Sequence, residues 1–383
     1  MKVLIAGGGT GGHLFPGIAL AEEVVTRHPA NEVVFVGTEK GLEARVVPRE
    51  GYPLELVKVQ GLKGKGLLGL IKGLLALPLA FLASFRILSR QKPDVVVGVG
   101  GYASGPVVLA AWLMGIPTAI QEQNALPGLT NKVLGRIVKV VFTSFEEARN
   151  HFPEAKVQMI GNPIRKKLMD NYLRSSAAHE RFSVLVFGGS LGARGLNSRV
   201  LDALDSLGDV KDQLAIVHQT GKLDLENVKK GYADKGFSDV AQVVEFIDDM
   251  SSAYAKADLV ICRAGATSLA ELTVCKKPSI LVPFPHATDN HQEVNARALV
   301  DAGAAVMFRE SELTGQKLAE TLRGLMTDPA KLKQMAKKAG ILGRPAAAKE
   351  LADVCVDLTT QAWGPGGRDR GPKDVKKAPG SKA

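Results

Sequence analysis

Two stretches decide the fold: Val3-Leu4-Ile5-Ala6-Gly7-Gly8-Gly9-Thr10-Gly11-Gly12-His13 near the start, and Val184-Leu185-Val186-Phe187-Gly188-Gly189-Ser190-Leu191-Gly192 far downstream. In each, an uninterrupted apolar run leads into glycines and then into a helical pattern. Apolar runs without polar alternation are typical of strands buried on both faces, as in parallel sheets covered by helices. Two such beginnings predict an α/β protein with two doubly wound domains, in which ligands bind beyond the carboxyl ends of the strands.

Further apolar runs separated by helical patterns extend this prediction along the chain. At 383 residues the chain suits two domains. We place the boundary near Asn162-Pro163, which predicts domains at 1–162 and 163–362 and a disordered Gly-, Pro-, Lys- and Arg-rich tail at 363–383. The other predicted strands are Val33–Val36, Val95–Val99, Lys139–Phe142, Val157–Ile160, Leu214–His218, Val240–Ile247, Leu259–Ile261 and Ser279–Val282.

Composition narrows the class of partner and the compartment. Three cysteines without close spacing indicate neither a disulfide framework nor a zinc knuckle, and the first residues leave no room for a signal peptide, so we expect no export. The net charge of +10 is compatible with nucleic acid, anionic lipid or a phosphorylated substrate. The glycine turns and an apolar segment of the chain favour a phosphorylated substrate and anionic lipid as partners, and we expect no nucleic acid.

The segment Leu67–Leu88 is unusually apolar. Its charge-free part, Gly73–Phe85, is shorter than the roughly 20 residues that span a bilayer, and Pro78 would kink it. Lysines precede this charge-free part and Arg86 and Arg90 follow it, so the segment could dock on anionic headgroups. An ordinary buried crossover helix is the alternative.

The first glycine turn matches a dinucleotide fingerprint only in part. Gly7, Gly9 and Gly12 satisfy G-x-G-x-x-G between a strand and a helix. A nicotinamide enzyme also needs an acidic residue at the end of the second strand, where Val36 is followed by glycine and threonine and Glu39 comes late. A nicotinamide-dependent oxidoreductase is therefore the less favoured alternative.

His13 directly follows this turn and is the candidate general base. An imidazole has an unperturbed pKa near 6.5, so at the start of a helix beside the cleft it could take a proton from an acceptor hydroxyl. A structural capping histidine is the other interpretation.

Two further turns of the first domain carry polar groups. The glycine-rich turn Gly98–Pro106 follows an apolar run, and its Tyr102 and Ser104 can grip a diphosphate. Gln121–Asn124 ends another strand of the same sheet, so its amides and carboxylate would point into the same crevice. For Glu122, a hydrogen-bonded core carboxylate is the alternative interpretation.

The second domain offers groups suited to a nucleotide diphosphate. Arg165 supplies a positive charge beside the boundary, and Ser190 supplies a hydroxyl at a helix start. Small residues in Cys262–Ala270 admit a ligand, and Glu271 behind them can accept hydrogen bonds from a ribose diol. The polar stretch Pro283–Gln292 suits sugar hydroxyls.

No metal or cofactor is expected. The chain has no Asp-x-Asp triplet where a nucleotide-bound metal would lie, and no metal-ligand spacing of histidine and cysteine. Asp248-Asp249 stands at a predicted helix start, where N-capping is the simpler interpretation. The leaving diphosphate is then stabilised by helix dipoles and cations.

Taken together and in order, nine motifs resemble the MurG family, the peptidoglycan N-acetylglucosaminyltransferases of glycosyltransferase family 28. The resemblance runs from Met1 to about Trp363. Its motifs are Gly7–His13, Gly61–Gly66, Gly100–Pro106, Glu122–Asn124, Gly161–Arg165, Gly188–Gly192, Phe246–Met250, Arg263–Glu271 and Pro283–Gln292.

The resemblance implies a GT-B fold, in which two Rossmann-like doubly wound parallel-sheet domains face each other across a cleft and the final helix returns to the first domain. It implies inverting transfer of N-acetylglucosamine from UDP-N-acetylglucosamine to the C4 hydroxyl of lipid I, giving lipid II. The enzyme would be peripheral at the cytoplasmic face of the plasma membrane, near other cell-wall synthesis proteins.

The same resemblance assigns residue roles. His13 would be the general base, Glu271 would hold the ribose in the catalytic site, and Ile247 would read uracil through its backbone. The residues expected to line the substrate site are Thr10, Gly11, Gly12, Asn124, Arg165, Ser190, Ile247, Ala266, Thr267, Ser268, Leu269, Ala270 and Gln292.

Two positions depart from the family pattern. Gln121 stands where the family usually has histidine, which would remove a titratable group from the acceptor side. Leu191 stands where it usually has glutamine, which would remove a hydrogen bond near the donor sugar. Among enzymes, the nearest alternative is a transferase of the same architecture with another lipid acceptor, such as diacylglycerol.

Overall fold

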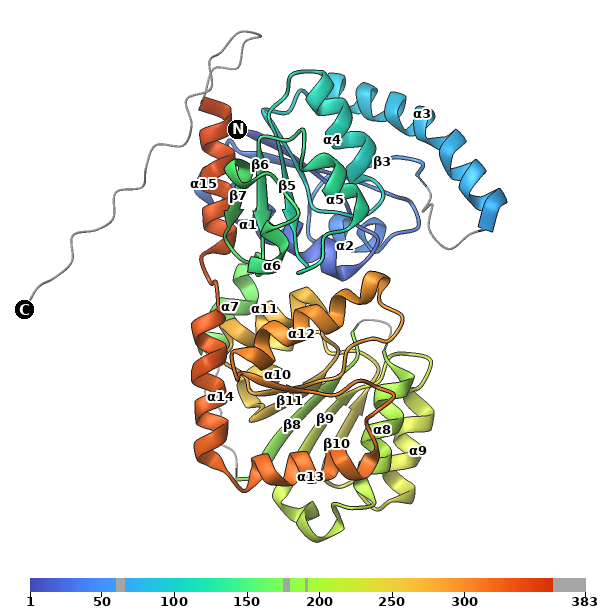
Figure 1. Cartoon of the computed structure of the whole chain (residues 1–383), viewed down its shortest axis with the longest axis vertical. Helices are drawn as coiled ribbons and strands as arrows, with labels where there is room; N and C mark the ends of the chain where they lie inside the picture. The colour runs from blue at the N-terminus through green and yellow to red at the C-terminus, as the bar shows by residue number, and fades with distance from the viewer. Residues whose placement is uncertain (60–65, 175–179, 190–191, 361–383) are drawn as a thin grey trace, which may run out of the picture.

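The computed structural model describes residues 1–59, 66–174, 180–189 and 192–360, and the backbone alone for 66–77. Two parallel sheets lie end to end, each with helices on its faces (Figure 1). The predicted α/β class and the two doubly wound domains are confirmed. The tail at 363–383 and the motif Gly61–Gly66, except for Gly66, lie outside the described residues.

The first sheet has seven parallel strands in the order β3-β2-β1-β4-β5-β6-β7. Valine, isoleucine and leucine dominate its central strands, which are buried on both faces, as the continuous apolar runs predict. The strands are β1 (Lys2–Ala6), β2 (Glu32–Gly37), β3 (Leu54–Leu56), β4 (Val95–Gly98), β5 (Thr118–Glu122), β6 (Val140–Thr143) and β7 (Val157–Met159).

The second sheet has six parallel strands in the order β10-β9-β8-β11-β12-β13. Its core includes Val184, Val186 and Ile261 from the central strands. The strands are β8 (Phe182–Phe187), β9 (Leu214–Gln219), β10 (Ala241–Val244), β11 (Leu259–Cys262), β12 (Ser279–Leu281) and β13 (Ala305–Met307).

Helices connect successive strands and cover both sheets (Figure 1). Around the first sheet they are α1 (Gly11–Arg27), α2 (Glu43–Arg49), α3 (Gly66–Gln91), α4 (Ser104–Leu113), α5 (Leu129–Leu134) and α6 (Glu146–Arg149), with a short 3-10 helix at Glu154–Lys156. The remaining α-helices are α7 (Lys166–Arg174), α8 (Arg194–Leu204), α9 (Leu225–Asp234), α10 (Met250–Lys256), α11 (Ala266–Val274), α12 (His291–Asp301), α13 (Gly315–Met326), α14 (Pro329–Leu342) and α15 (Ala347–Thr360), and 3-10 helices cover Gly208–Gln213 and Thr288–Asn290.

The last helix, α15, lies alongside α1 on the first domain (Figure 1). Its Leu351 and Cys355 are buried in the core of that domain. Arg27 of α1 fastens the helix further, because it pairs with Asp353 at 2.7 Å and donates to the Lys349 carbonyl at 2.8 Å. The chain thus crosses between the domains twice. The exact domain limits, 1–162 and 163–362, remain a prediction.

Some element limits differ from the predicted ones. The predicted strand Val240–Ile247 ends at Val244, because the residues that follow form a loop that leads into α10. The short strands β3 and β13 were not predicted; both lie at sheet edges and have only three residues. Pro78 lies within α3, which continues through it.

Candidate functional site

The order of strands reverses between β1 and β4 in the first sheet and between β8 and β11 in the second. Such reversal points open a crevice at the carboxyl ends of the strands, where doubly wound sheets bind their ligands. The loops that follow β1, β4 and β8 begin the glycine-rich turns singled out in the sequence, and the loop after β11 begins the small-residue stretch before Glu271. The fold therefore places the predicted motifs at the two ligand-binding edges.

In the first domain the two glycine turns touch each other. The Gly8 amide donates to the Gly100 carbonyl at 3.3 Å. A Cβ on Gly7 would lie 2.4 Å from that same oxygen, and one on Gly101 would lie 2.3 Å from the Gly8 carbonyl. Only glycine allows this approach, which brings the start of α1 beside the loop after β4.

Glu43, at the start of α2, holds the first turn in place and was not recognised in the sequence. Its carboxylate is 1% exposed and accepts hydrogen bonds from the Gly9 amide at 2.6 Å and from both the amide and the hydroxyl of Thr38 at 2.8 Å. The nearby Gly37 and Gly41 were the available signal, since a Cβ on either would strike this side chain. A buried carboxylate at this turn opposes a dinucleotide phosphate there, so it counts against the nicotinamide alternative.

His13 is the third residue of α1 and is half-buried against Gly100, where a Cβ would lie 2.7 Å from the imidazole. Its Nδ1 lies 3.4 Å from the Thr10 hydroxyl. Burial lowers the pKa of His13, with a smaller contribution in the same direction from His291, while a hydrogen bond with the Gly8 backbone and the charge of Glu43 oppose the shift. The imidazole is therefore neutral near pH 7 and able to accept a proton.

Two hydrogen-bonded contacts join the domains at this edge. The Thr267 hydroxyl, at the start of α11, donates to the Gly12 carbonyl at 3.4 Å. Asn295 of α12 accepts from the Ala125 amide at 2.8 Å and donates to the Asn124 side chain at 3.2 Å. The structure thus brings Gly12, Asn124 and Thr267 to one interface, together with Thr10, Gly11 and His13 next to Gly12.

Glu122 supports the Asn124 loop from below. It is 1% exposed, and its carboxylate accepts from the Asn124 amide at 2.9 Å, the Asn131 side chain at 2.9 Å and the Gly128 amide at 3.3 Å. Burial raises its pKa, and these hydrogen bonds oppose the rise. These contacts match the structural alternative for Glu122.

Gln121 lies in the interior of the first domain. Its side chain is fully buried and donates to the Ser144 hydroxyl and to the Gly161 carbonyl, both at 3.1 Å. The effect of this position on the titration of the acceptor side stays a prediction. Leu191 lies outside the described residues.

Glu271 and Arg165 approach each other in the second domain. Glu271 is 8% exposed, and its carboxylate accepts a hydrogen bond from the Tyr254 hydroxyl at 2.9 Å. Burial raises the pKa of Glu271, whereas the positive charge of Arg165 and the Tyr254 hydrogen bond oppose the rise. The Arg165 guanidinium itself lies 4.6 Å from the centre of the Phe15 ring on α1.

Five of the predicted donor residues, Ala266 to Ala270, form the start of α11. In the first turns of α11, Ala266 and Leu269 are buried in the core, so Thr267, Ser268 and Ala270 supply its accessible surface. Ser190 lies outside the described residues.

Two other predicted donor residues have partners that the sequence did not indicate. The Ile247 amide donates to the Gln219 side chain at 2.9 Å, and the Gln292 side chain accepts from the Phe284 amide at 2.9 Å. The first contact fixes the loop that contains Ile247, and the second fixes the loop that contains Phe284. Both loops belong to the predicted donor site.

Asp249 is the N-cap of α10, as predicted. Its carboxylate accepts from the Ser252 amide, and hydrogen bonds with Ser251 and Ser252 lower its pKa to about 2. Within the described ranges, no three His, Cys, Asp or Glu side chains gather in a way that could hold a metal ion.

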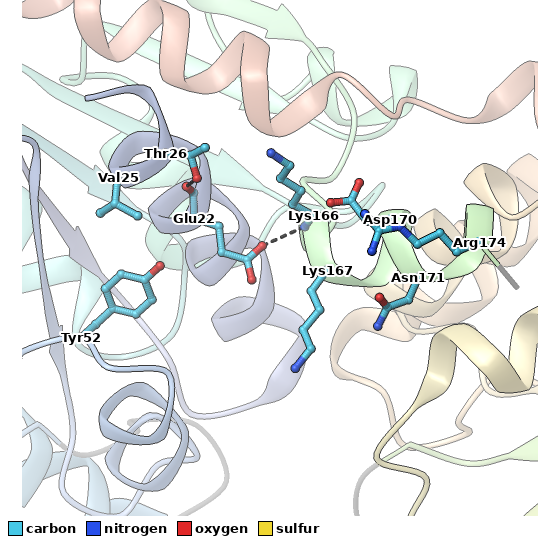
Figure 2. Close-up of a pocket in the computed structure, with 9 residues that line it drawn as sticks. All are labelled: Glu22, Val25, Thr26, Tyr52, Lys166, Lys167, Asp170, Asn171 and Arg174. Carbon is cyan, nitrogen blue, oxygen red and sulfur yellow. Dashed lines mark hydrogen bonds between the residues drawn. The ribbon is translucent and has the colours of Figure 1, made fainter. Parts of the chain in front are cut away.

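A surface pocket of about 360 Å³ lies away from this interface, between α1 and α7 (Figure 2). Glu22 and Tyr52 line one side, and Lys166, Lys167 and Arg174 line the other. Across the pocket the Glu22 carboxylate accepts from the Lys166 amide at 2.8 Å. No residue of the predicted site lines this pocket.

Two parallel-sheet domains with ligand-binding turns at both reversal points define the GT-B fold. Two family models match the chain: the glycosyltransferase family 28 N-terminal domain over residues 3–143 and the family 28 C-terminal domain over 183–352. The chain belongs to glycosyltransferase family 28.

Named relatives agree with this assignment. The chain is 81% identical over 382 residues, covering 100% of this chain and 99% of the relative, to the UDP-N-acetylglucosamine--N-acetylmuramyl-(pentapeptide) pyrophosphoryl-undecaprenol N-acetylglucosamine transferase of Myxococcus xanthus. It is 63% identical to the protein of the same name from Anaeromyxobacter dehalogenans, over 97% of each chain.

Solved structures share the fold. The crystal structure of Acinetobacter baumannii MurG is 33% identical with a TM-score of 0.75, covering 93% of this chain and 99% of that one. An S. aureus MnaA structure with UDP has a TM-score of 0.64 at 16% identity, covering 94% of this chain and 98% of that one, which is a likeness of fold alone.

Proposed function

We propose that this enzyme transfers N-acetylglucosamine from UDP-N-acetylglucosamine to lipid I, the undecaprenyl-diphosphate-linked N-acetylmuramyl-pentapeptide, and releases lipid II and UDP. The observation that carries the proposal is the full-length identity of 81% to a transferase named for this donor and this acceptor. The hydrogen bond from Thr267 to the Gly12 carbonyl supports the proposal, because it places the first glycine turn of one domain against the start of a helix of the other.

His13 acts as the general base. Its lowered pKa keeps the imidazole neutral, so it takes the proton of the C4 hydroxyl as that oxygen attacks the anomeric carbon. The bond between the anomeric carbon and the diphosphate oxygen breaks in the same displacement, which inverts the configuration at that carbon. UDP leaves with the bonding electron pair.

The second domain holds the donor. Arg165 and the amino terminus of α11 favour the negative charge that grows on the leaving diphosphate. Glu271 accepts hydrogen bonds from the ribose hydroxyls, and Arg165 and Tyr254 favour its charged form against the effect of burial. Ile247 and Gln292 are among the residues that supply further contacts to the donor.

The enzyme works as a peripheral protein at the cytoplasmic face of the plasma membrane, where it meets its lipid acceptor and the other cell-wall synthesis proteins. Within the described part of the chain, no helix combines the length and apolar character that crossing a bilayer needs. The proposed contact is an apolar surface on the adjacent helices α3, α4 and α5 (Figure 1). Its exposed members are Leu79, Leu82, Phe85, Leu109, Trp112, Leu113, Leu129 and Val133.

The exposed cations Arg86, Lys132 and Arg136 lie on or next to the same helices, so anionic headgroups suit this surface. In the same part of α3, Ala80, Ser84 and the Ile87–Leu88 pair are buried. The helix therefore combines a packed inner side, as a crossover helix has, with an apolar outer side. For residues 67–77 the side chains lie outside the description.

Activity is tested by incubating the protein with radiolabelled UDP-N-acetylglucosamine and either lipid I or diacylglycerol. We expect label to enter lipid II and no label to enter diacylglycerol. Label in diacylglycerol, or no UDP release with lipid I, would reject the proposed acceptor.

The base is tested with His13→Asn, and the matched control is His28→Asn, at the exposed end of α1. Loss of general-base catalysis lowers kcat by about 10²- to 10⁴-fold. We expect little change in the KM for the donor, and the His28 variant should retain full activity. An unchanged kcat in the His13 variant would remove His13 from the mechanism.

A further inference from the structure

The contact between Glu22 and α7 links the two domains at the level of the backbone. Glu22 belongs to α1 of the first domain, whereas Leu168 of α7 is buried in the core of the second. The Glu22 carboxylate accepts from the backbone amide of Lys166, the first residue of α7, at 2.8 Å (Figure 2). An amide at that position has no partner within its own helix, so a side chain of the other domain supplies it.

A second contact from the same helix reaches the neighbouring residue. Phe15 and Glu22 are seven residues apart, which places both on one face of α1. The Phe15 ring lies 4.6 Å from the Arg165 guanidinium, and Glu22 holds the amide of Lys166 directly after it. One face of α1 therefore contacts both Arg165 and the start of α7.

The chemistry of Glu22 suits this contact. A carboxylate at a helix amino terminus gains from both the free amides and the helix dipole. Burial raises the pKa of Glu22, and Glu50 adds to the rise, while the Lys166 amide and the charges of Arg165 and Lys167 oppose it. Because the pocket beside Glu22 opens to solvent, replacing the side chain leaves no sealed cavity.

We infer that Glu22 is a positioning residue that fastens Arg165 and the start of α7 to α1. The same helix carries His13 at its amino end, so the contact sets the distance between the proposed base and the group that faces the diphosphate. This inference rests on the role of Arg165 under the proposed function.

The test compares the dissociation constants of UDP and uridine, since only UDP carries the phosphates that Arg165 would face. In Glu22→Ala we expect UDP to bind roughly five-fold more weakly, the equivalent of one lost capping contact, and uridine to bind as before. In Glu22→Gln, whose amide oxygen can still accept, the loss should be smaller. The matched control is Glu23→Gln, because Glu23 pairs with Arg27 of its own helix.

The Arg165→Ala variant distinguishes the donor role of Arg165 from the positioning role of Glu22. If Arg165→Ala weakens UDP but Glu22→Ala does not, the positioning role of Glu22 is wrong while the donor role of Arg165 stands. If Arg165→Ala has no effect, both the donor role and the inference are overturned. The double variant should lose no more UDP affinity than Arg165→Ala alone, and additive losses would also reject the inference.

Discussion

The double variant Leu79→Ala/Leu82→Ala removes part of the apolar surface on α3 and should weaken binding to membranes. Both side chains belong to the part of α3 whose side chains are described, and they are 68% and 54% exposed. Alanine retains helix propensity, so the change removes apolar surface without opposing the helix. Arg86 and the other cations remain in place.

The magnitude follows from the exposed fractions. Leu→Ala removes three carbon groups, each worth about 0.8 kcal/mol on full transfer from water, or about 2.4 kcal/mol in all. Scaled by exposure, the loss is about 1.6 kcal/mol at Leu79 and about 1.3 kcal/mol at Leu82. Together they amount to about 3 kcal/mol, a roughly 100-fold weaker membrane affinity.

Sedimentation with phosphatidylglycerol vesicles measures this affinity, with phosphatidylcholine vesicles for comparison. Ile341→Ala is the matched control, because Ile341 is 70% exposed but lies on α14 of the second domain. We expect the control to bind like the unaltered protein and binding to weaken as salt is added. Unchanged vesicle affinity in the double variant would refute the assignment of this surface.

Three further predictions concern buried or half-buried groups. Because burial lowers the pKa of His13, the acid limb of a pH profile of kcat/KM should lie below pH 6.5; a limb above that value would exclude His13 as the base. Burial holds the pKa of His218 at about 3, so between pH 6.5 and 3 the unfolded chain binds the extra proton. The free energy of unfolding should therefore decrease as the pH is lowered through that window, by up to about 1.4 kcal/mol per pH unit in urea unfolding. His218→Leu should lack this contribution. Glu43→Ala leaves the Gly9 and Thr38 amides without their acceptor, and we expect a loss of about 3 kcal/mol in the same assay; a loss under 1 kcal/mol would contradict the bracing role.

Much of the site could be predicted from single motifs. Gly7–His13 and the small residues before Glu271 stand directly after strands, and the end of a parallel strand is where such folds bind ligands. Asp249 could be recognised as an N-cap from its position alone. The limits of these assignments appear at Ile247, where a strand was predicted and a loop is found.

The residues that were missed share one property: their partners are distant in sequence. Glu43 braces an amide 34 residues earlier, Asn295 contacts a loop 170 residues earlier, and Glu22 contacts a helix 144 residues later. Apart from the glycines near Glu43, no local pattern marks these side chains, because a buried or capping polar residue has the same kinds of neighbours in sequence as one on the surface.

By itself the sequence determined the two α/β domains, the parallel sheets and the family, because strand burial and glycine turns are local properties that repeat along the chain. The tertiary structure alone decided that Gln121 lies in the interior, that Glu43 occupies the first turn and that α1 is the helix against which the returning α15 packs. These outcomes depend on which distant segments meet once the chain has folded, and that meeting is set by packing of the whole molecule.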